Sequence, residues 1–240
     1  MPFWCAWRDT KEALMHDPRA AGSLARHAAL AAVLDGVGAG RYPPPDGTVT
    51  ILAQPSEQDA GVVSLTAWAV VFADGDPDWI AAQLPAGDLY APLSAPFLAA
   101  LGKRLGRRSH SVDMLTCAAP LPGPPPDLQL EELATGSAEA VHPRLARALR
   151  YRDDVRAWRA AGGIVTLGRG LADRWEVSIE VDAEYRGRGL GARLATAARH
   201  LVPADAALWA QIAPANAASV RAFLRAGFWP VGAEALLSRD

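Results

Sequence analysis

The chain has 240 residues, half of them apolar, and a formal net charge of −2 at pH 7. That length is ample for a buried core and can hold one large domain or two small ones. The charge gives no general attraction to nucleic acid or to an anionic membrane, and no stretch approaches the roughly twenty uncharged apolar residues of a membrane-spanning helix. We therefore expect a protein that binds neither nucleic acid nor membrane.

The first residues and the cysteines indicate the cytoplasm. The opening stretch MPFWCAWRDTKEALM is apolar, but it is too short and too soon charged for a secretory signal. Cys5 and Cys117 have no metal-ligand spacing, so we expect no metal site. Two reduced thiols are the favoured interpretation, and one disulfide bond is the alternative.

The first part of the chain mixes helical and strand patterns. Alanine-rich residues 11–34 predict one or two helices, interrupted near Pro18. Short helices are expected from Pro77 and from Ala91. Runs rich in β-branched and apolar residues predict strands at VTIL (49–52), VVSLTAWAVVF (62–72) and SVDMLTC (111–117).

A proline-rich stretch, APLPGPPPD at 119–127, follows these elements. Proline at that density favours an extended, semi-rigid connector. The sequence therefore predicts an N-terminal α/β domain over residues 1–118, a linker over 119–127 and a second domain over 128–240.

Strands and helices alternate after the linker, which is typical of an α/β layer fold. We expect a helix over 145–161, ended by Gly162 and Gly163. Further helices are predicted over 189–202 and 217–226, and strands over 128–133, 164–168, 175–181, 207–213 and 230–238.

The stretch VDAEYRGRGLGARL at 181–194 concentrates glycine and arginine between a predicted strand and a predicted helix. The first amides of a helix are unpaired and carry the positive end of its dipole, so such a junction binds anions. Glycine lets phosphate oxygens approach the backbone, because no Cβ atom is in the way. This order of elements favours a phosphate site over a plain surface turn.

Two phosphate-binding motifs compete for this run. Gly187, Gly189 and Ala192 formally satisfy the dinucleotide fingerprint G-x-G-x-x-A. That motif needs its first glycine almost at the end of the strand and an acid at the end of the next strand. Several residues follow Val181 before Gly187, and no acid lies between Asp205 and Glu234. The dinucleotide interpretation is therefore disfavoured.

The other motif is R-x-x-G-x-G/A, which Arg186, Gly189 and Gly191 satisfy. A second motif follows at 216–228, NAASVRAFLRAGF, which fits the pattern N-x-x-A/S-x-x-x-Y/F-x-x-x-G-F. With both motifs at this separation, residues 128–240 resemble the GNAT superfamily of acyl-CoA-dependent N-acyltransferases. The resemblance implies a mixed central sheet flanked by helices, and a loop that wraps the pyrophosphate of coenzyme A.

The resemblance also implies roles for single residues. The strand that carries Ile179 and Val181 would pair with the pantetheine arm and splay from the next strand, and Asn216 would lie near the same arm. Asn216 also suits an ordinary helix cap. The residues so assigned to acetyl-CoA or another acyl-CoA donor are Ile179, Val181, Arg186, Gly187, Arg188, Gly189, Leu190, Gly191, Ala192, Asn216, Ser219 and Phe223.

The chain departs from the family pattern at the catalytic positions. Phe223 stands where many members have a tyrosine acid, and Gln211 stands where one subfamily has a glutamate base. Glu176 and Glu180 lie on the strand where other members keep a base, and they are our candidate catalytic residues. Simple alternation favours a solvated face for both, and a β-bulge would change that count.

An N-acyltransferase with a small-molecule amine, a protein N-terminus or a lysine as acceptor is the function that the resemblance implies. The alternative is a non-catalytic acyl-CoA-binding sensor or assembly module. Residues 1–118 carry no motif; they fit either a degenerate half of the same fold or an unrelated layer. We expect a monomer or a homodimer.

Overall fold

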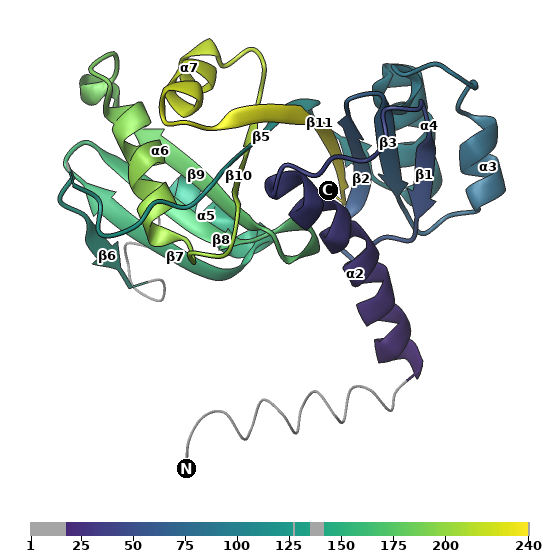
Figure 1. Ribbon diagram of the computed structural model, residues 1–240, viewed down its shortest axis with the longest axis horizontal. Helices are drawn as coiled ribbons and strands as arrows, with labels where there is room; N and C mark the ends of the chain where they lie inside the picture. Colours follow the sequence, from purple (N-terminus) through teal and green to yellow (C-terminus); the bar gives the residue numbers. More distant parts are fainter. Residues whose placement is uncertain (1–17, 127, 135–141, 240) are drawn as a thin grey trace.

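One mixed β-sheet runs through the whole molecule in this computed structural model, which describes residues 18–126, 128–134 and 142–239 (Figure 1). The strands lie in the order β1-β3-β2-β11-β5-β10-β9-β8-β7-β6, and the short β4 pairs with β11 beside this path. The fold is therefore the mixed α/β class expected from the alternation of strands and helices.

The part of the chain before the proline-rich stretch begins with one long helix and continues through short strands and helices. The expected helix over 11–34 is described from Pro18 onwards; its first residues, like Cys5, lie outside the described residues. The elements are α2 (Pro18–Gly38), β1 (Val49–Leu52), β2 (Ala60–Leu65), β3 (Trp68–Phe72), α3 (Pro77–Ala82), the 3₁₀ turn η1 (Ala91–Leu93), α4 (Ala95–Leu105), β4 (Arg108–Ser109) and β5 (Asp113–Ala118).

The second part supplies the other half of the sheet and three helices. Its elements are β6 (Glu131–Leu133), α5 (Pro143–Tyr151), β7 (Asp153–Ala160), β8 (Gly163–Arg169), η3 (Leu171–Asp173), β9 (Trp175–Val181), η4 (Ala183–Tyr185), α6 (Leu190–Leu201), β10 (Leu208–Ile212), α7 (Ala217–Arg225) and β11 (Trp229–Ser238).

The predicted helix over 145–161 is wrong beyond Tyr151. Helix α5 ends there, and β7 then runs antiparallel to β8, with Ala160 opposite Gly163. Gly162 has a φ of 85° and belongs to the turn between the two strands rather than to a helix end. Ala157 and Trp158 are both buried, so the strand lacks the alternation that distinguishes it from a helix, and pairing with β8 decides the outcome.

Strand β5 joins the two parts of the chain. It precedes the proline-rich stretch, yet it lies between β10 and β11 and pairs antiparallel with both; Cys117 is opposite Trp209 on one side and Trp229 on the other. The sheet is therefore continuous across the proposed domain boundary at 119–127 (Figure 1). That boundary remains a proposal, based on the order of the elements along the chain.

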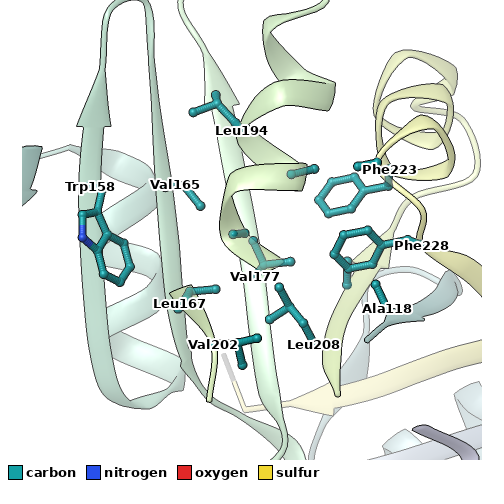
Figure 2. Close-up of a cluster of buried hydrophobic side chains, with 14 of the residues drawn as sticks. Ala118, Trp158, Val165, Leu167, Val177, Leu194, Val202, Leu208, Phe223 and Phe228 are labelled. Carbon is teal, nitrogen blue, oxygen red and sulfur yellow. The ribbon is translucent and has the colours of Figure 1, made fainter. Parts of the chain in front are cut away.

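Helices cover both faces of the sheet. Helices α6 and α7 pack on one face of the C-terminal strands, where Leu194 and Phe223 meet Val165 and Val177 in the core cluster of Figure 2. The opposite face is covered by α2 over the middle strands and by α5 over β7 and β8. The β9–β10 junction therefore lies between two covered faces.

The described residues contain one free cysteine, Cys117, which is fully buried in the centre of the sheet. Burial raises the pKa of this thiol to about 12, so the group is neutral and unreactive at physiological pH. Within the described ranges, no helix is both long and apolar enough to cross a membrane.

Candidate functional site

Two neighbouring parallel strands, β9 and β10, separate soon after they begin. They pair only at Trp175 with Leu208 and at Glu176 with Trp209, whereas β9 pairs with β8 along its whole length. Beyond Glu176, the β10-facing edge of β9 has no partner among the described strands, and Ile179 and Val181 lie on this stretch. Such an open edge can hydrogen-bond an extended ligand as an added strand would.

The glycine–arginine run forms the loop between β9 and α6. Gly187 and Gly189 have φ angles of 74° and 81°, a left-handed conformation that costs a residue with a Cβ atom roughly 1–2 kcal/mol. A Cβ atom at either position would meet no other heavy atom within 4 Å. The glycines therefore border open space at the end of β9.

The start of α6 offers positive potential to that space. The first amides of a helix have no intrahelical acceptor, and the N-cap residue Gly189 contributes no side-chain hydrogen bond. The Nε of Arg186 donates to the carbonyl of Val181 at 3.1 Å, which holds its charge over the end of β9. Arg188 in the same loop adds a second positive charge, so the arrangement is suited to an anion.

Gly191 lies where the first turn of α6 faces α7 and β9. A Cβ atom there would lie 3.4 Å from the Cβ of Ala222 and 3.7 Å from a methyl group of Val181. These are ordinary van der Waals distances, so alanine would also fit at this position, in agreement with the G/A alternative of the motif. Leu190 is buried beside it and anchors the same turn in the core.

The second sequence motif forms the start and the inner side of α7. The side chain of Asn216 accepts a hydrogen bond from the amide of Ser219 at 3.1 Å, so Asn216 is the N-cap of this helix. Phe223 is 4% exposed and packs edge-to-face on Phe228, with ring centroids 4.9 Å apart. Figure 2 shows both rings in the same apolar cluster as Leu194.

A buried charged cluster lies where β9 and β10 separate, on the face opposite α6. Glu176 is 5% exposed, so the expected solvated face is wrong for this residue. Its carboxylate accepts hydrogen bonds from Arg152 at 3.0 Å, Arg174 at 2.9 Å and Gln211 at 2.8 Å. Alternation along β9 correctly placed Glu176 on the face opposite α6. The sequence did not reveal that α5 and the residues around Arg174 cover this face.

Gln211 links this cluster to strand β11. Its Nε2 atom also contacts Glu234 at 3.1 Å, and Arg174 donates to the same carboxylate at 2.9 Å. Glu234 is 2% exposed. The side chains of β9, β10 and β11 are thereby joined on one face, directly beneath the point where the first two strands part.

The two buried carboxylates differ in their electrostatics. Burial alone would raise the pKa of Glu176, but the charges of Arg174 and Arg152 outweigh it and hold that pKa below its ordinary value. Burial raises the pKa of Glu234, and Arg174 offsets only part of the increase. Glu176 is therefore an anion at neutral pH and a weak proton acceptor.

Glu180 has a different environment from Glu176. It lies two positions beyond Ser178 on the same face, its side chain is 36% exposed, and Arg144 of α5 is its ion-pair partner at 3.4 Å. Its carboxylate is therefore open to water. Among the described residues, no group of histidine, cysteine and acidic side chains is arranged to hold a metal ion.

Arg152, Arg174 and Glu234 are the members of the site that sequence reasoning missed. Arg174 is two positions before Glu176, a spacing that puts both side chains on one face of a strand. Glu234 stands alone within the apolar run VGAEALL, and a lone acid there signals a buried partner. Arg152 gave no such signal, because the predicted helix over 145–161 misplaced it.

The site coincides with the region that matches a known family. A sequence model of the Acetyltransferase (GNAT) family matches residues 133–228. No match was found among curated proteins.

Three solved structures are similar to the chain. A GCN5-related N-acetyltransferase from Kribbella flavida has 21% identity and a TM-score of 0.39, covering 60% of this chain and 63% of its own. A putative GNAT acetyltransferase from Novosphingobium aromaticivorans has 23% identity and a TM-score of 0.38, covering 56% and 68%. A tandem GNAT protein from the clavulanic acid biosynthesis pathway, solved without AcCoA, has 16% identity and a TM-score of 0.36, covering 74% and 63%.

The alignments span less than two thirds of the first and third of those structures. Because identities are below 25% and TM-scores below 0.5, no property of this chain is inferred from them.

Proposed function

We propose that this protein transfers an acetyl or small acyl group from coenzyme A to an amine, a proposal supported by the match of residues 133–228 to the GNAT acetyltransferase family model. The observation that carries the proposal is the junction of β9 and α6. There an open strand edge ends in a loop whose glycines border free space at a helix N-terminus. An extended arm and a pyrophosphate at its end are the shape that this junction fits.

The acyl-CoA donor would supply the activated thioester, and the chain would hold it in place. The edge of β9 at Ile179 and Val181 would pair with the pantetheine arm. The amides of residues 187–192 and the arginines at 186 and 188 would bind the pyrophosphate. Positioning of this kind can provide a large share of the rate acceleration by itself.

Of the two candidate bases, Glu180 fits the role better than Glu176. Glu176 already accepts three hydrogen bonds and has a lowered pKa, whereas Glu180 has one arginine partner and access to water. A base must exchange its proton with solvent after each turnover. We therefore assign proton removal from the acceptor amine to Glu180. Glu176 has a structural role, in which it stabilises the point where β9 and β10 separate.

A turnover assay tests the function. The protein is incubated with acetyl-CoA and a panel of amines that includes small metabolites, peptide N-termini and lysine side chains, and the release of free thiol is followed. We expect thiol release that depends on one acceptor class, and Glu180→Gln should lower kcat while the affinity for coenzyme A stays the same. If the protein bound coenzyme A but showed no turnover with any acceptor, the proposed acyltransferase activity would be contradicted.

The second candidate is a non-catalytic acyl-CoA sensor or assembly module. It is favoured by Phe223, which has no hydroxyl to protonate a leaving thiolate, and by the saturated carboxylate of Glu176. Tight acyl-CoA binding without turnover, together with a ligand-dependent change in oligomeric state or partner association, would select it. Size-exclusion chromatography with and without acetyl-CoA measures the oligomeric state, for which monomer and homodimer are the two proposals.

The compartment proposed for either function is the cytoplasm, where acyl-CoA donors are made and thiols such as that of Cys117 stay reduced.

A further inference from the structure

The loop that follows β9 rests on the tip of the β7–β8 hairpin. The amide of Asp182, the first residue after β9, donates to the carbonyl of Gly162 at 2.9 Å. Arg159 of β7 faces the carboxylate of Asp182 at 3.9 Å. The hairpin tip is therefore in contact with the point where the loop begins.

The aromatic ring of Tyr185 makes the closest of these contacts. A Cβ atom at Gly162 would overlap three carbon atoms of that ring, Cγ, Cδ1 and Cδ2. The ring thus lies directly on the bare Cα atom of Gly162, where no other residue type leaves room for it. Tyr185 is the last residue of η4, and Arg186 of the family motif follows it immediately.

The rest of the loop is held mainly at its two ends. Arg186 bonds back to the carbonyl of Val181 on β9, and downstream Leu190 enters the core. Between these points, added Cβ atoms at Gly187 and Gly189 would touch nothing within 4 Å, and residues 183–189 are exposed. The ring of Tyr185 on Gly162 is therefore the side-chain contact through which the hairpin supports the loop just before Arg186 and the glycine amides.

We propose that Gly162 and Tyr185 are positioning residues for the coenzyme A pyrophosphate: the bare Cα atom of Gly162 seats the ring, and the seated ring sets the loop. Neither residue needs to touch the ligand. The inference rests on the proposed function, since it takes the loop to be the pyrophosphate site. It adds that the β7–β8 hairpin, remote from the motif in sequence, determines donor affinity.

The substitution Gly162→Ala tests whether the ring of Tyr185 must pack on the bare Cα atom of this residue. Its methyl group displaces the ring and with it the loop amides that would bind the pyrophosphate. Because hydrogen bonds to charged groups are lost, we expect the affinity for coenzyme A, measured by isothermal titration calorimetry, to fall about tenfold to a hundredfold. The affinity for pantetheine, which lacks the pyrophosphate, should not change. In turnover, the KM for acetyl-CoA should rise while kcat and the KM for the acceptor stay constant.

Two further variants separate the ring from the backbone strain at a left-handed glycine. Gly87→Ala is the matched control, because Gly87 has a φ of 78° and a Cβ atom there would meet nothing within 4 Å; it should leave coenzyme A binding unchanged. Tyr185→Ala should weaken coenzyme A binding like Gly162→Ala. In the double variant, Gly162→Ala should then cause no further loss, because the ring it displaces is gone.

Several results would overturn the inference. Unchanged coenzyme A affinity in Tyr185→Ala would do so, even if Gly162→Ala failed to fold. An equal loss from Gly162→Ala with and without the ring would assign the effect to backbone strain alone. A parallel loss of pantetheine affinity would place the effect outside the pyrophosphate loop. If wild-type protein bound no coenzyme A, the proposed function would fall and this inference with it.

Discussion

The β9–α6 and β3–α3 junctions are both strand–loop–helix connections, but their loops have opposite chemistry. The β9–α6 junction is built from Arg186, Arg188 and two left-handed glycines, and its helix begins without a side-chain cap. At the β3–α3 junction, the carboxylate of Asp76 caps the helix by accepting from the amide of Asp78 at 3.0 Å. At the β3–α3 junction, the N-terminus of the helix is thus capped by a carboxylate of the chain itself. At the β9–α6 junction, the N-terminus of the helix has no such side-chain cap and can accept an anion from a ligand.

This difference shows that an anion site depends on the residues of the loop more than on the fold around it. In the N-terminal junction an aspartate already occupies the position that a phosphate oxygen would take, and Asp78 adds further negative charge. The N-terminal half therefore contributes to the site through its strands and helix α2. Its β5 completes the sheet beside β10, and α2 covers the face under Trp209.

The largest effect is expected from breaking β5, through which the N-terminal half supports the C-terminal half. Thr116 is fully buried in this central strand. Proline at this position has no N–H group, so a hydrogen bond between β5 and a neighbouring strand of the sheet is lost. Thr116→Pro should lower the free energy of unfolding by at least about 3 kcal/mol, measured by urea denaturation.

Thr116→Val is the matched control for that substitution. It removes only the hydrogen bond from the hydroxyl to the carbonyl of Ala210, which is 3.1 Å long, and should cost about 1 kcal/mol. If Thr116→Pro were as stable as Thr116→Val, the C-terminal half would not depend on this strand.

The next effect concerns the buried charged cluster that links β9, β10 and β11. Glu176→Gln leaves Arg174 and Arg152 without their shared anion and should cost about 3–5 kcal/mol at neutral pH. Because the pKa of Glu176 is lowered in the folded state, its stabilisation is present above the ordinary carboxyl pKa and is lost as pH falls through the lowered value.

Urea denaturation between pH 7 and pH 3 measures this linkage. Wild-type stability should fall with pH more steeply than that of Glu176→Gln. Glu180→Gln is the control, since its partly exposed ion pair should contribute little. Equal slopes in wild type and Glu176→Gln would contradict the ionised, arginine-bound state of Glu176.

A smaller and more local effect should follow from filling the open loop. Gly189→Asn places a side chain where the pyrophosphate would lie, and asparagine tolerates the left-handed backbone better than other residues. We expect coenzyme A affinity to fall about tenfold to a hundredfold, because hydrogen bonds to the charged pyrophosphate are lost. Stability should be nearly unchanged; calorimetry and thermal unfolding measure the two effects.

The other junction provides the control for Gly189→Asn. Asp76→Ala removes the cap of α3 and should cost about 1 kcal/mol of stability, yet leave coenzyme A affinity as it was. A loss of coenzyme A affinity in Asp76→Ala, or none in Gly189→Asn, would undo the contrast between the two loops.

Local signals allowed the glycine loop and the helix cap of the C-terminal half to be anticipated from the sequence. The order of strand, glycine loop and helix around Gly189, and the cap at Asn216, are encoded within a few residues of each other, so both were predictable. The strand β7 and the burial of Glu176 were not. Each depends on a partner distant in the sequence, β8 for the one and Arg152 and Gln211 for the other. The contact between the ring of Tyr185 and Gly162 could not be predicted for the same reason.

The smallest effect is expected at Phe223, where a tyrosine would restore the acid seen in many members of the family. The ring is 4% exposed and packs against Phe228 in the core, so a new hydroxyl has few partners and should cost about 1–3 kcal/mol if left unpaired. General acid catalysis can give roughly 10² to 10⁴-fold where it operates, but in the proposed reaction water could protonate the departing thiolate instead. We therefore expect kcat of Phe223→Tyr within about threefold of wild type, with Phe228→Tyr as a control for packing alone. A rise in kcat of about tenfold or more in Phe223→Tyr would show instead that protonation of the thiolate limits the rate, and that the hydroxyl reaches it.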